Sequence, residues 1–126
     1  MKIVICLGDS TTAGTPLFKS PVETPPAGDG DERSQFAYWL QASHPEWRAL
    51  NRGVNGERSD EIARRFDRDV LAHSPDAVVI IAGVNDVYQG RPASVVIEQL
   101  SAMYARAGQA KRPMSRPFII MTWFSE

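Results

Sequence analysis

Ser10 stands where a reactive hydroxyl can be exposed, between an apolar run and Gly14 in the stretch GDSTTAG (8–14). A serine hydroxyl at a tight turn can act as the nucleophile in acyl transfer. Two more polar, glycine-containing motifs follow later apolar runs: NRGVNG (51–56) and GVND (83–86). Each motif alone is common. Three of them after successive predicted strands make a much stronger signal for a functional site.

Strand and helix patterns alternate around these motifs. Strands are predicted at 3–7, 48–51, 77–82 and 118–122, and helices at 35–43, 59–72 and from Pro92 to about residue 108. The strongest strand patterns are apolar throughout, which is typical of a parallel sheet covered by helices on both faces. The predicted fold class is therefore α/β, a flavodoxin-like three-layer α/β/α domain. Ligands of such sheets bind beyond the carboxyl ends of the strands, where the three motifs fall.

Apolar residues at helical spacing predict which helix faces are buried. These residues are Phe36, Trp39, Leu40, Ile62, Phe66, Val70, Val96, Leu100, Met103 and Ala107. Trp47 and Cys6 are also expected in the core. Ser34 and Ser59 are expected to cap the first two helices, and Gly108 to end the third.

Together the three motifs resemble those of the SGNH (GDSL-type) hydrolase family of esterases and lipases. The Gly-Asp-Ser, Asn-x-Gly-x-x-Gly and Gly-x-Asn-Asp blocks of that family are matched by Gly8-Asp9-Ser10, by Asn51, Gly53 and Gly56, and by Gly83, Asn85 and Asp86. Arg65 lies nine residues after Gly56, where the family frequently has an arginine. We expect Arg65 to tie its helix to the neighbouring loop. The resemblance covers residues 2 to about 107, with a weaker continuation through Thr122.

The resemblance implies a serine hydrolase of carboxylic esters that acts on small-molecule or acylated substrates, without a cofactor or metal ion. By the family pattern, Ser10 is the nucleophile. The oxyanion of the tetrahedral intermediate is bound by the backbone N–H groups of Ser10 and Gly56 and by the side-chain amide of Asn85. Glycine leaves room for the carbonyl oxygen of the substrate, and a carboxamide donates without carrying charge. Asp9 and Asp86 are expected to hold the turns that carry these groups.

A serine nucleophile needs a base, and here the sequence departs from the family. The family supplies Asp and His from an Asp-x-x-His block past a fifth strand, whereas this chain has no such block and two histidines, His44 and His73. Both stand at the ends of predicted helices that lead into strands. They are therefore expected at the edge of the sheet opposite Ser10, where the helix dipole favours histidine. We expect residues 1–126 to form a single, C-terminally truncated domain with four strands, impaired in catalysis.

Several explanations of the missing base stay open. Truncation is ranked first, ahead of a histidine supplied by another chain and of a protein that binds an ester or a partner without cleaving it. An alternative from another class is a flavodoxin-like FMN-binding module, in which the hydroxyl-rich residues 10–15 would hold the phosphate. That alternative leaves Gly56 and Asn85 unexplained, and a flavin absorption band of the purified protein would favour it.

Composition and charge exclude other classes of protein. The 126 residues carry 14 Lys+Arg and 15 Asp+Glu, and a net charge of −1 argues against a strongly basic nucleic-acid binder. No apolar run reaches about 18 residues, so no membrane span is expected. One cysteine excludes an internal disulfide.

The short apolar run at the amino terminus is not a signal peptide, so a cytoplasmic location is expected. Residues 16–33, rich in Pro and Gly, are predicted to form a long surface loop, either a lid or partly disordered.

Overall fold

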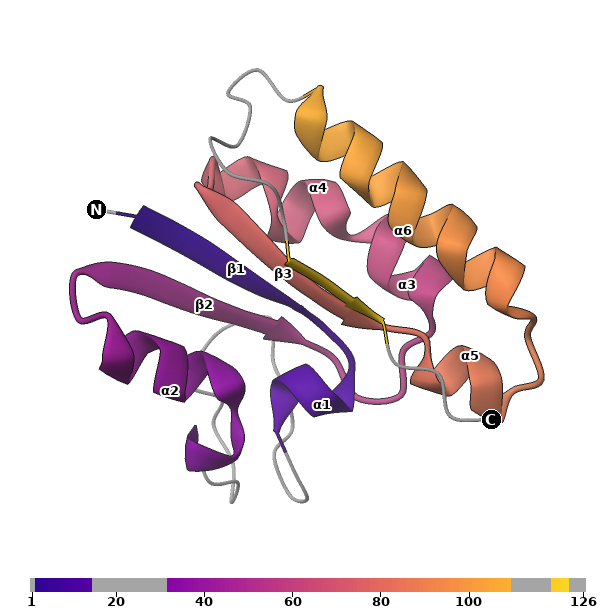
Figure 1. Cartoon of the computed structure of the whole chain (residues 1–126), viewed down its shortest axis with the longest axis horizontal. Coiled ribbons are helices and arrows are strands. Elements are labelled where there is room, and N and C mark those ends of the chain that lie inside the picture. The colour runs from indigo at the N-terminus through magenta and orange to yellow at the C-terminus, as the bar shows by residue number, and fades with distance from the viewer. Residues whose placement is uncertain (1, 15–31, 110–118, 123–126) are drawn as a thin grey trace.

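The structure is a computed structural model of the chain that describes residues 2–14, 32–109 and 119–122 (Figure 1). Most of the predicted long loop, residues 16–31, lies outside the described residues, as does residue 118 of the last predicted strand. Among the helices that the structure describes, none has the length and apolar character needed to cross a membrane.

Four strands form a parallel sheet, as the sequence predicts. They are β1 (Lys2–Gly8), β2 (Trp47–Gly53), β3 (Ala77–Ala82) and β4 (Ile119–Thr122), in the spatial order β2-β1-β3-β4. The last residue of β1, Gly8, pairs with Gly53 of β2 and with Ile81 of β3. Because all neighbouring strands are parallel, their carboxyl ends meet at one edge of the sheet. We call this the carboxyl edge.

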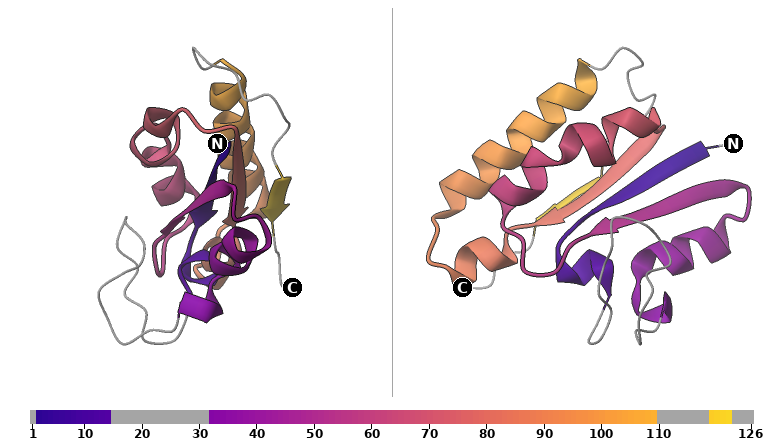
Figure 2. Two further views of the ribbon diagram at one scale, coloured as in Figure 1. Left: turned by 90° about the vertical axis from the view of Figure 1, so that its left-hand side faces the viewer. Right: turned by 180° about the vertical axis from the view of Figure 1, so that it is seen from behind.

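Helices cover both faces of the sheet, which confirms the predicted three-layer α/β/α class (Figures 1 and 2). The short α1 (Ser10–Ala13) and α2 (Phe36–Ser43) pack on β2. The other layer contains α3 (Ser59–Arg64), α4 (Phe66–Asp69) and the long α6 (Ala93–Gly108), which packs against α3. Two single turns of 3-10 helix, η1 (Glu32–Ser34) and η2 (Leu71–His73), and the short α5 (Val84–Tyr88) complete the described elements.

The main core lies between the sheet and the layer of α3, α4 and α6. The predicted helix positions in this layer are all buried: Ile62, Phe66, Val70, Val96, Leu100, Met103 and Ala107. Each large apolar side chain buried in this way contributes about 1.5–3 kcal/mol. Cys6 is also in the interior, and burial raises the pKa of its thiol to about 12. The interpretation of Cys6 as a small core residue is therefore confirmed.

The predicted continuous helix at 59–72 is wrong, because the structure breaks it at Arg65. Arg65 ends α3 and precedes α4 with φ −99° and ψ 10°, and η2 follows α4. Its side chain turns inward to bind backbone carbonyl groups, which requires this departure from a regular helix. The predicted cap at Ser59 is also wrong. Arg58 precedes the helix, and Ser59 is its first residue.

The predicted face of α2 needs a similar correction. Gln35, not Ser34, is the N-cap residue, and Trp39 is 55% exposed rather than part of the core. The indole N–H of Trp39 donates to the Arg33 carbonyl at 2.8 Å, which holds the ring at the surface. Phe36 and Trp47 are half-buried, so of the four predicted core aromatics Phe66 alone is fully buried.

Gly53 permits a close approach between β2 and α1. A Cβ atom at this position would lie 2.3 Å from the Ala13 nitrogen and 2.7 Å from its Cα. Gly53→Ala is therefore expected to lower the free energy of unfolding by about 1–3 kcal/mol, because backbone atoms must move. Urea unfolding measures this change. Gly108→Ala is the control, since a Cβ there meets nothing within 4 Å. Equal stability of the two variants would contradict the described contact.

Candidate active site

Ser10 begins α1 directly after the end of β1. Asp9 is the N-cap residue, and its Oδ1 accepts a hydrogen bond from the Thr11 N–H at 2.9 Å. The N–H groups of Thr12 and Ala13 donate to the Asp9 carbonyl at 3.1 and 2.9 Å. The first N–H groups of a helix have no partner within the helix, so the Ser10 N–H, at the first position of α1, is not used inside this helix. Ser10 itself is half-buried.

Asn51, near the end of β2, joins this strand to the turn that carries Ser10. The amide nitrogen of Asn51 donates to the Thr12 carbonyl at 3.0 Å and to Gln35 Oε1 at 2.7 Å, and its oxygen accepts from the Gly53 N–H at 2.8 Å. Asn51 is buried, which makes it a structural tie between β2, α1 and the start of α2.

Gly56 lies further along the same loop with φ +79°, a conformation that favours glycine. A Cβ atom there would meet nothing within 4 Å, so the space next to its backbone is open. The loop is held near the end of β1 by the Val54 N–H, which donates to the Gly8 carbonyl at 3.0 Å. The loop that carries Gly56 is therefore attached to the end of β1 and leaves space on the side where a side chain would point.

The loop after β3 is joined to the Gly56 loop by Asn85. Its side-chain amide donates to the Glu57 carbonyl at 2.9 Å, directly after Gly56. Asp86, the next residue, is fully buried and accepts from the Ser59 N–H at 2.8 Å and the Ser59 hydroxyl at 2.7 Å. A carboxamide has two N–H groups, so the bond to Glu57 leaves one of them available.

Arg65 connects the ends of β1 and β2 with the Gly56 loop, which agrees with the predicted tie to a neighbouring loop. Its guanidinium donates to the carbonyl groups of Gly8 and Arg52 at 2.8 and 2.7 Å. It also forms ion pairs with Glu57 at 2.6 Å and Asp69 at 2.9 Å, and is 7% exposed. Burial raises the pKa of Asp69, but hydrogen bonds from Arg68 and Arg65 outweigh it and leave the pKa below the ordinary value.

The structure brings the three predicted loops together at the carboxyl edge. The end of β1, just before the Ser10 turn, is bonded to the Gly56 loop, and the Gly56 loop is bonded to the Asn85 loop. Asp9 and Asp86 are fully buried, and burial raises the pKa of Asp9, with a smaller contribution from the charge of Asp86. Asp9 holds a backbone N–H of its own turn, as expected, whereas Asp86 accepts from Ser59 and ties the loop after β3 to the start of α3 instead of holding its own turn.

Neither histidine approaches Ser10. His44 caps the carboxyl end of α2 and stacks on Trp47, with ring centroids 3.7 Å apart. His73 ends η2, and burial together with the charge of Arg52 lowers its pKa. Both precede strands, whereas Ser10 follows one. Because the seven residues of β1 span roughly 20 Å, both histidines lie at the opposite edge, as predicted.

Sequence reasoning missed two contributors to this arrangement. The Glu57 carbonyl accepts from the Asn85 amide, and the Glu57 carboxylate binds Arg65. Its position directly after Gly56 is the sequence feature that could have identified it. Gln35 reaches Asn51 from the start of α2, and no pattern in the sequence indicates this contact.

Comparisons with known proteins agree with this geometry. A sequence model of the GDSL-like Lipase/Acylhydrolase family matches residues 6–123. An acetylxylan esterase from Geobacillus stearothermophilus is 30% identical over 93 residues, which cover 68% of this chain and 42% of that protein. The chain thus spans about half the length of the relatives it matches.

Solved structures show the same fold. A G-D-S-L family protein from Desulfitobacterium hafniense matches with a TM-score of 0.70 at 22% identity, covering 97% of this chain and 57% of that one. Axe2, an acetylxylan esterase from Geobacillus stearothermophilus, matches with a TM-score of 0.64 at 26% identity, covering 98% and 60%. A variant of Axe2 in which a histidine is replaced by alanine is described as a catalytic mutant.

Proposed function

Because the chain belongs to the GDSL-like Lipase/Acylhydrolase family, we propose that it provides the nucleophile and the oxyanion site of a serine hydrolase of carboxylic esters. The main support is the set of hydrogen bonds that joins three loops at the carboxyl edge. These loops carry Ser10, Gly56 and Asn85. In this proposal residues 1–126 act as a single domain.

The proposed reaction begins when the Ser10 hydroxyl attacks the ester carbonyl. The alcohol leaves, an acyl group stays on Ser10, and water then releases the carboxylic acid. In both steps the carbonyl oxygen becomes an oxyanion. The Ser10 N–H, the Gly56 N–H and the second N–H of the Asn85 amide are the proposed donors to it. The Gly8–Val54 and Glu57–Asn85 hydrogen bonds support this assignment, because they fix the relative positions of the loops before substrate binds.

We propose that the base for Ser10 is not one of the two histidines of this chain. Both lie at the opposite edge of the sheet, and a variant of Axe2 with a histidine replaced by alanine is described as a catalytic mutant. Without a base, serine is a poor nucleophile at neutral pH. Residues 1–126 alone are then expected to hydrolyse esters orders of magnitude more slowly than a complete site. The acetylxylan esterase relative makes acetyl esters of sugars the first substrates to test.

Hydrolysis of p-nitrophenyl acetate tests the proposal in three forms. The first is the chain alone, the second is the chain with added imidazole as a soluble base, and the third is the extended chain, meaning residues 1–126 followed by an Asp-x-x-His segment from a family member. We expect a slow rate alone and faster rates with either base, after subtraction of the hydrolysis by imidazole itself. A folded extended chain that stays at background would refute the proposal and favour a non-catalytic ester- or partner-binding role.

Asn85→Ala is expected to lower kcat of the extended chain by about 10²–10³-fold, because it removes one donor to the oxyanion. The lost hydrogen bond to Glu57 should cost only about 1 kcal/mol of stability. Gln89→Ala is the matched control. Gln89 is an exposed amide directly after α5 that accepts from Arg58, and its loss should leave kcat unchanged. Similar kcat values for the two variants would remove Asn85 from the oxyanion site.

A further inference from the structure

We propose that Trp39 and Tyr88 are substrate-binding residues on either side of Ser10 that stack against sugar rings of a polysaccharide ester. The inference rests on the function proposed above and names its substrate class. Figure 1 shows α1, which begins with Ser10, between α2, which lies along β2, and α5, which follows the end of β3. Trp39 belongs to α2 and Tyr88 to α5. The two helices that carry these rings therefore lie on opposite sides of α1 in this view.

Trp39 combines exposure with a fixed orientation. More than half of it is exposed, yet its indole N–H is bonded to the Arg33 carbonyl, and Tyr38 packs edge-on against it with centroids 5.2 Å apart. The Arg33 segment lies against the end of α1, since a Cβ at Gly14 would be 2.5 Å from the Ser34 hydroxyl. Trp39 is thus connected to the nucleophile turn through one short segment. A large ring held in place loses little entropy on binding.

Tyr88 stands on the other side, one helical turn after Asn85. Residues three apart on a helix share a face, so Tyr88 and the proposed oxyanion donor Asn85 lie on the same side of α5. Tyr88 is 81% exposed, whereas Asp86 on the inner side of α5 is fully buried. The backbone beneath it is anchored, because the Val87 N–H donates to the Gly83 carbonyl at 3.1 Å and the Arg91 N–H to the Asp86 carbonyl at 2.8 Å.

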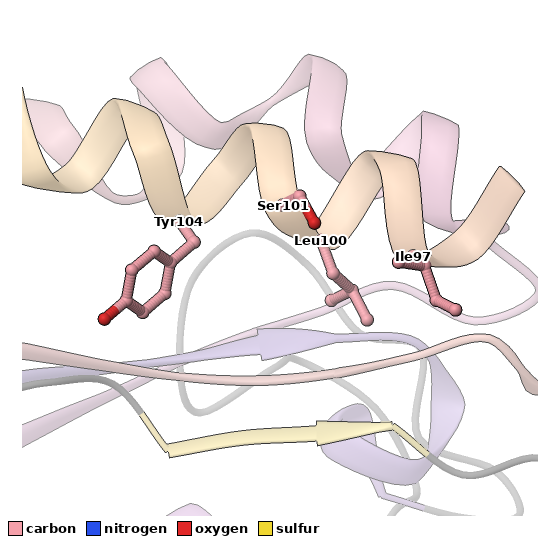
Figure 3. A pocket seen from close by; sticks show the side chains of 4 residues that line it. All are labelled: Ile97, Leu100, Ser101 and Tyr104. Atoms are coloured by element: carbon pink, nitrogen blue, oxygen red, sulfur yellow. The ribbon is translucent and has the colours of Figure 1, made fainter. Parts of the chain in front are cut away.

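Two separate aromatic rings are better suited to bind sugar rings than to bind an acyl chain. The C–H face of a sugar ring packs against the electron-rich face of an aromatic side chain, and a polysaccharide presents such faces at intervals. An acyl chain needs a continuous apolar groove. An apolar groove of about 230 Å³ occurs among the described residues, but it is lined by Ile97, Leu100, Ser101 and Tyr104 of α6. Figure 3 shows the Ile97, Leu100 and Tyr104 side chains directed from α6 toward the sheet.

Native gel electrophoresis in the presence of xylan tests the inference without requiring turnover. We expect xylan to retard the chain, and Trp39→Ala and Tyr88→Ala each to weaken the interaction by about tenfold or more. Tyr104→Ala is the matched control, because Tyr104 is a 48% exposed aromatic on α6. It should be retarded as strongly as the original chain. Trp39→Phe keeps a ring and tests the position if the alanine variant does not fold.

The outcomes separate this inference from the proposed function. The inference is overturned if xylan does not retard the chain, if both alanine variants are retarded normally, or if Tyr104→Ala weakens retardation equally. Ser10→Ala should bind xylan normally while the extended chain loses hydrolysis. Normal hydrolysis by Ser10→Ala together with ring-dependent retardation would reject the proposed nucleophile and keep the binding site.

Discussion

Ser10→Ala is expected to abolish ester hydrolysis by the extended chain, with a loss of at least about 10³-fold in kcat. Alanine has no hydroxyl to form the acyl intermediate, and the oxyanion donors alone retain only a small part of the rate enhancement. The fold should be unaffected, since the capping of α1 depends on Asp9 and alanine is well tolerated in a helix. The measurement is kcat for p-nitrophenyl acetate, together with detection of an acyl adduct by mass spectrometry.

The control for this change is Ser94→Ala, which removes an exposed serine hydroxyl near the start of α6. It should leave both the rate and the acyl adduct unchanged. Persistence of the adduct in Ser10→Ala would identify a different nucleophile. A normal rate in that variant would exclude the acyl-enzyme mechanism at Ser10.

The sheet and the long helix could be predicted from sequence because their patterns are strong and local. The apolar run of β3 was predicted with its observed bounds, and Val96, Leu100 and Met103 mark the buried face of α6. Their burial follows from apolar residues that recur at the period of a helix or a strand. This signal comes from local sequence, and few tertiary contacts at these positions work against it.

The short helices and the break at Arg65 could not be predicted in this way. α1 and α5 have four and five residues, too few for a helical period to be visible. The break before α4 arises because Arg65 binds the carbonyls of Gly8 and Arg52, which are distant in sequence. Trp39 was predicted as core from its spacing, but its hydrogen bond to the Arg33 carbonyl keeps it at the surface. Tertiary contacts override local pattern at each of these positions.

The candidate site likewise has features that the sequence predicts and features that it does not. Motifs after strands β1, β2 and β3 indicated which loops to compare, because parallel strands end at one edge. The bonds that fix these loops, such as Asn85 to the Glu57 carbonyl and Ser59 to Asp86, depend on side-chain directions. Sequence spacing carries no information on them. The site could therefore be located from sequence, but its internal geometry could not.

Arg65→Ala is expected to destabilise the fold by about 3–5 kcal/mol, the largest stability effect proposed for this chain. The change leaves the buried Asp69 carboxylate with one partner, the mostly exposed Arg68, and it leaves Glu57 without its ion pair. It also removes a donor from the carbonyl groups of Gly8 and Arg52. Since small domains are stable by only about 5–15 kcal/mol, much of the fold's stability would be lost. Urea unfolding followed by circular dichroism measures the change.

Arg64→Ala provides the matched control at the preceding position. Arg64 is 75% exposed and pairs with Asp60 at 3.4 Å, so its removal should change stability by less than about 1 kcal/mol. Arg65→Lys serves if the alanine variant does not fold. Lysine keeps the charge but lacks the planar fork that reaches two carbonyls and two carboxylates, so an intermediate loss is expected. Equal stability of the Arg64 and Arg65 variants would mean that the three loops of the candidate site are held together without this guanidinium.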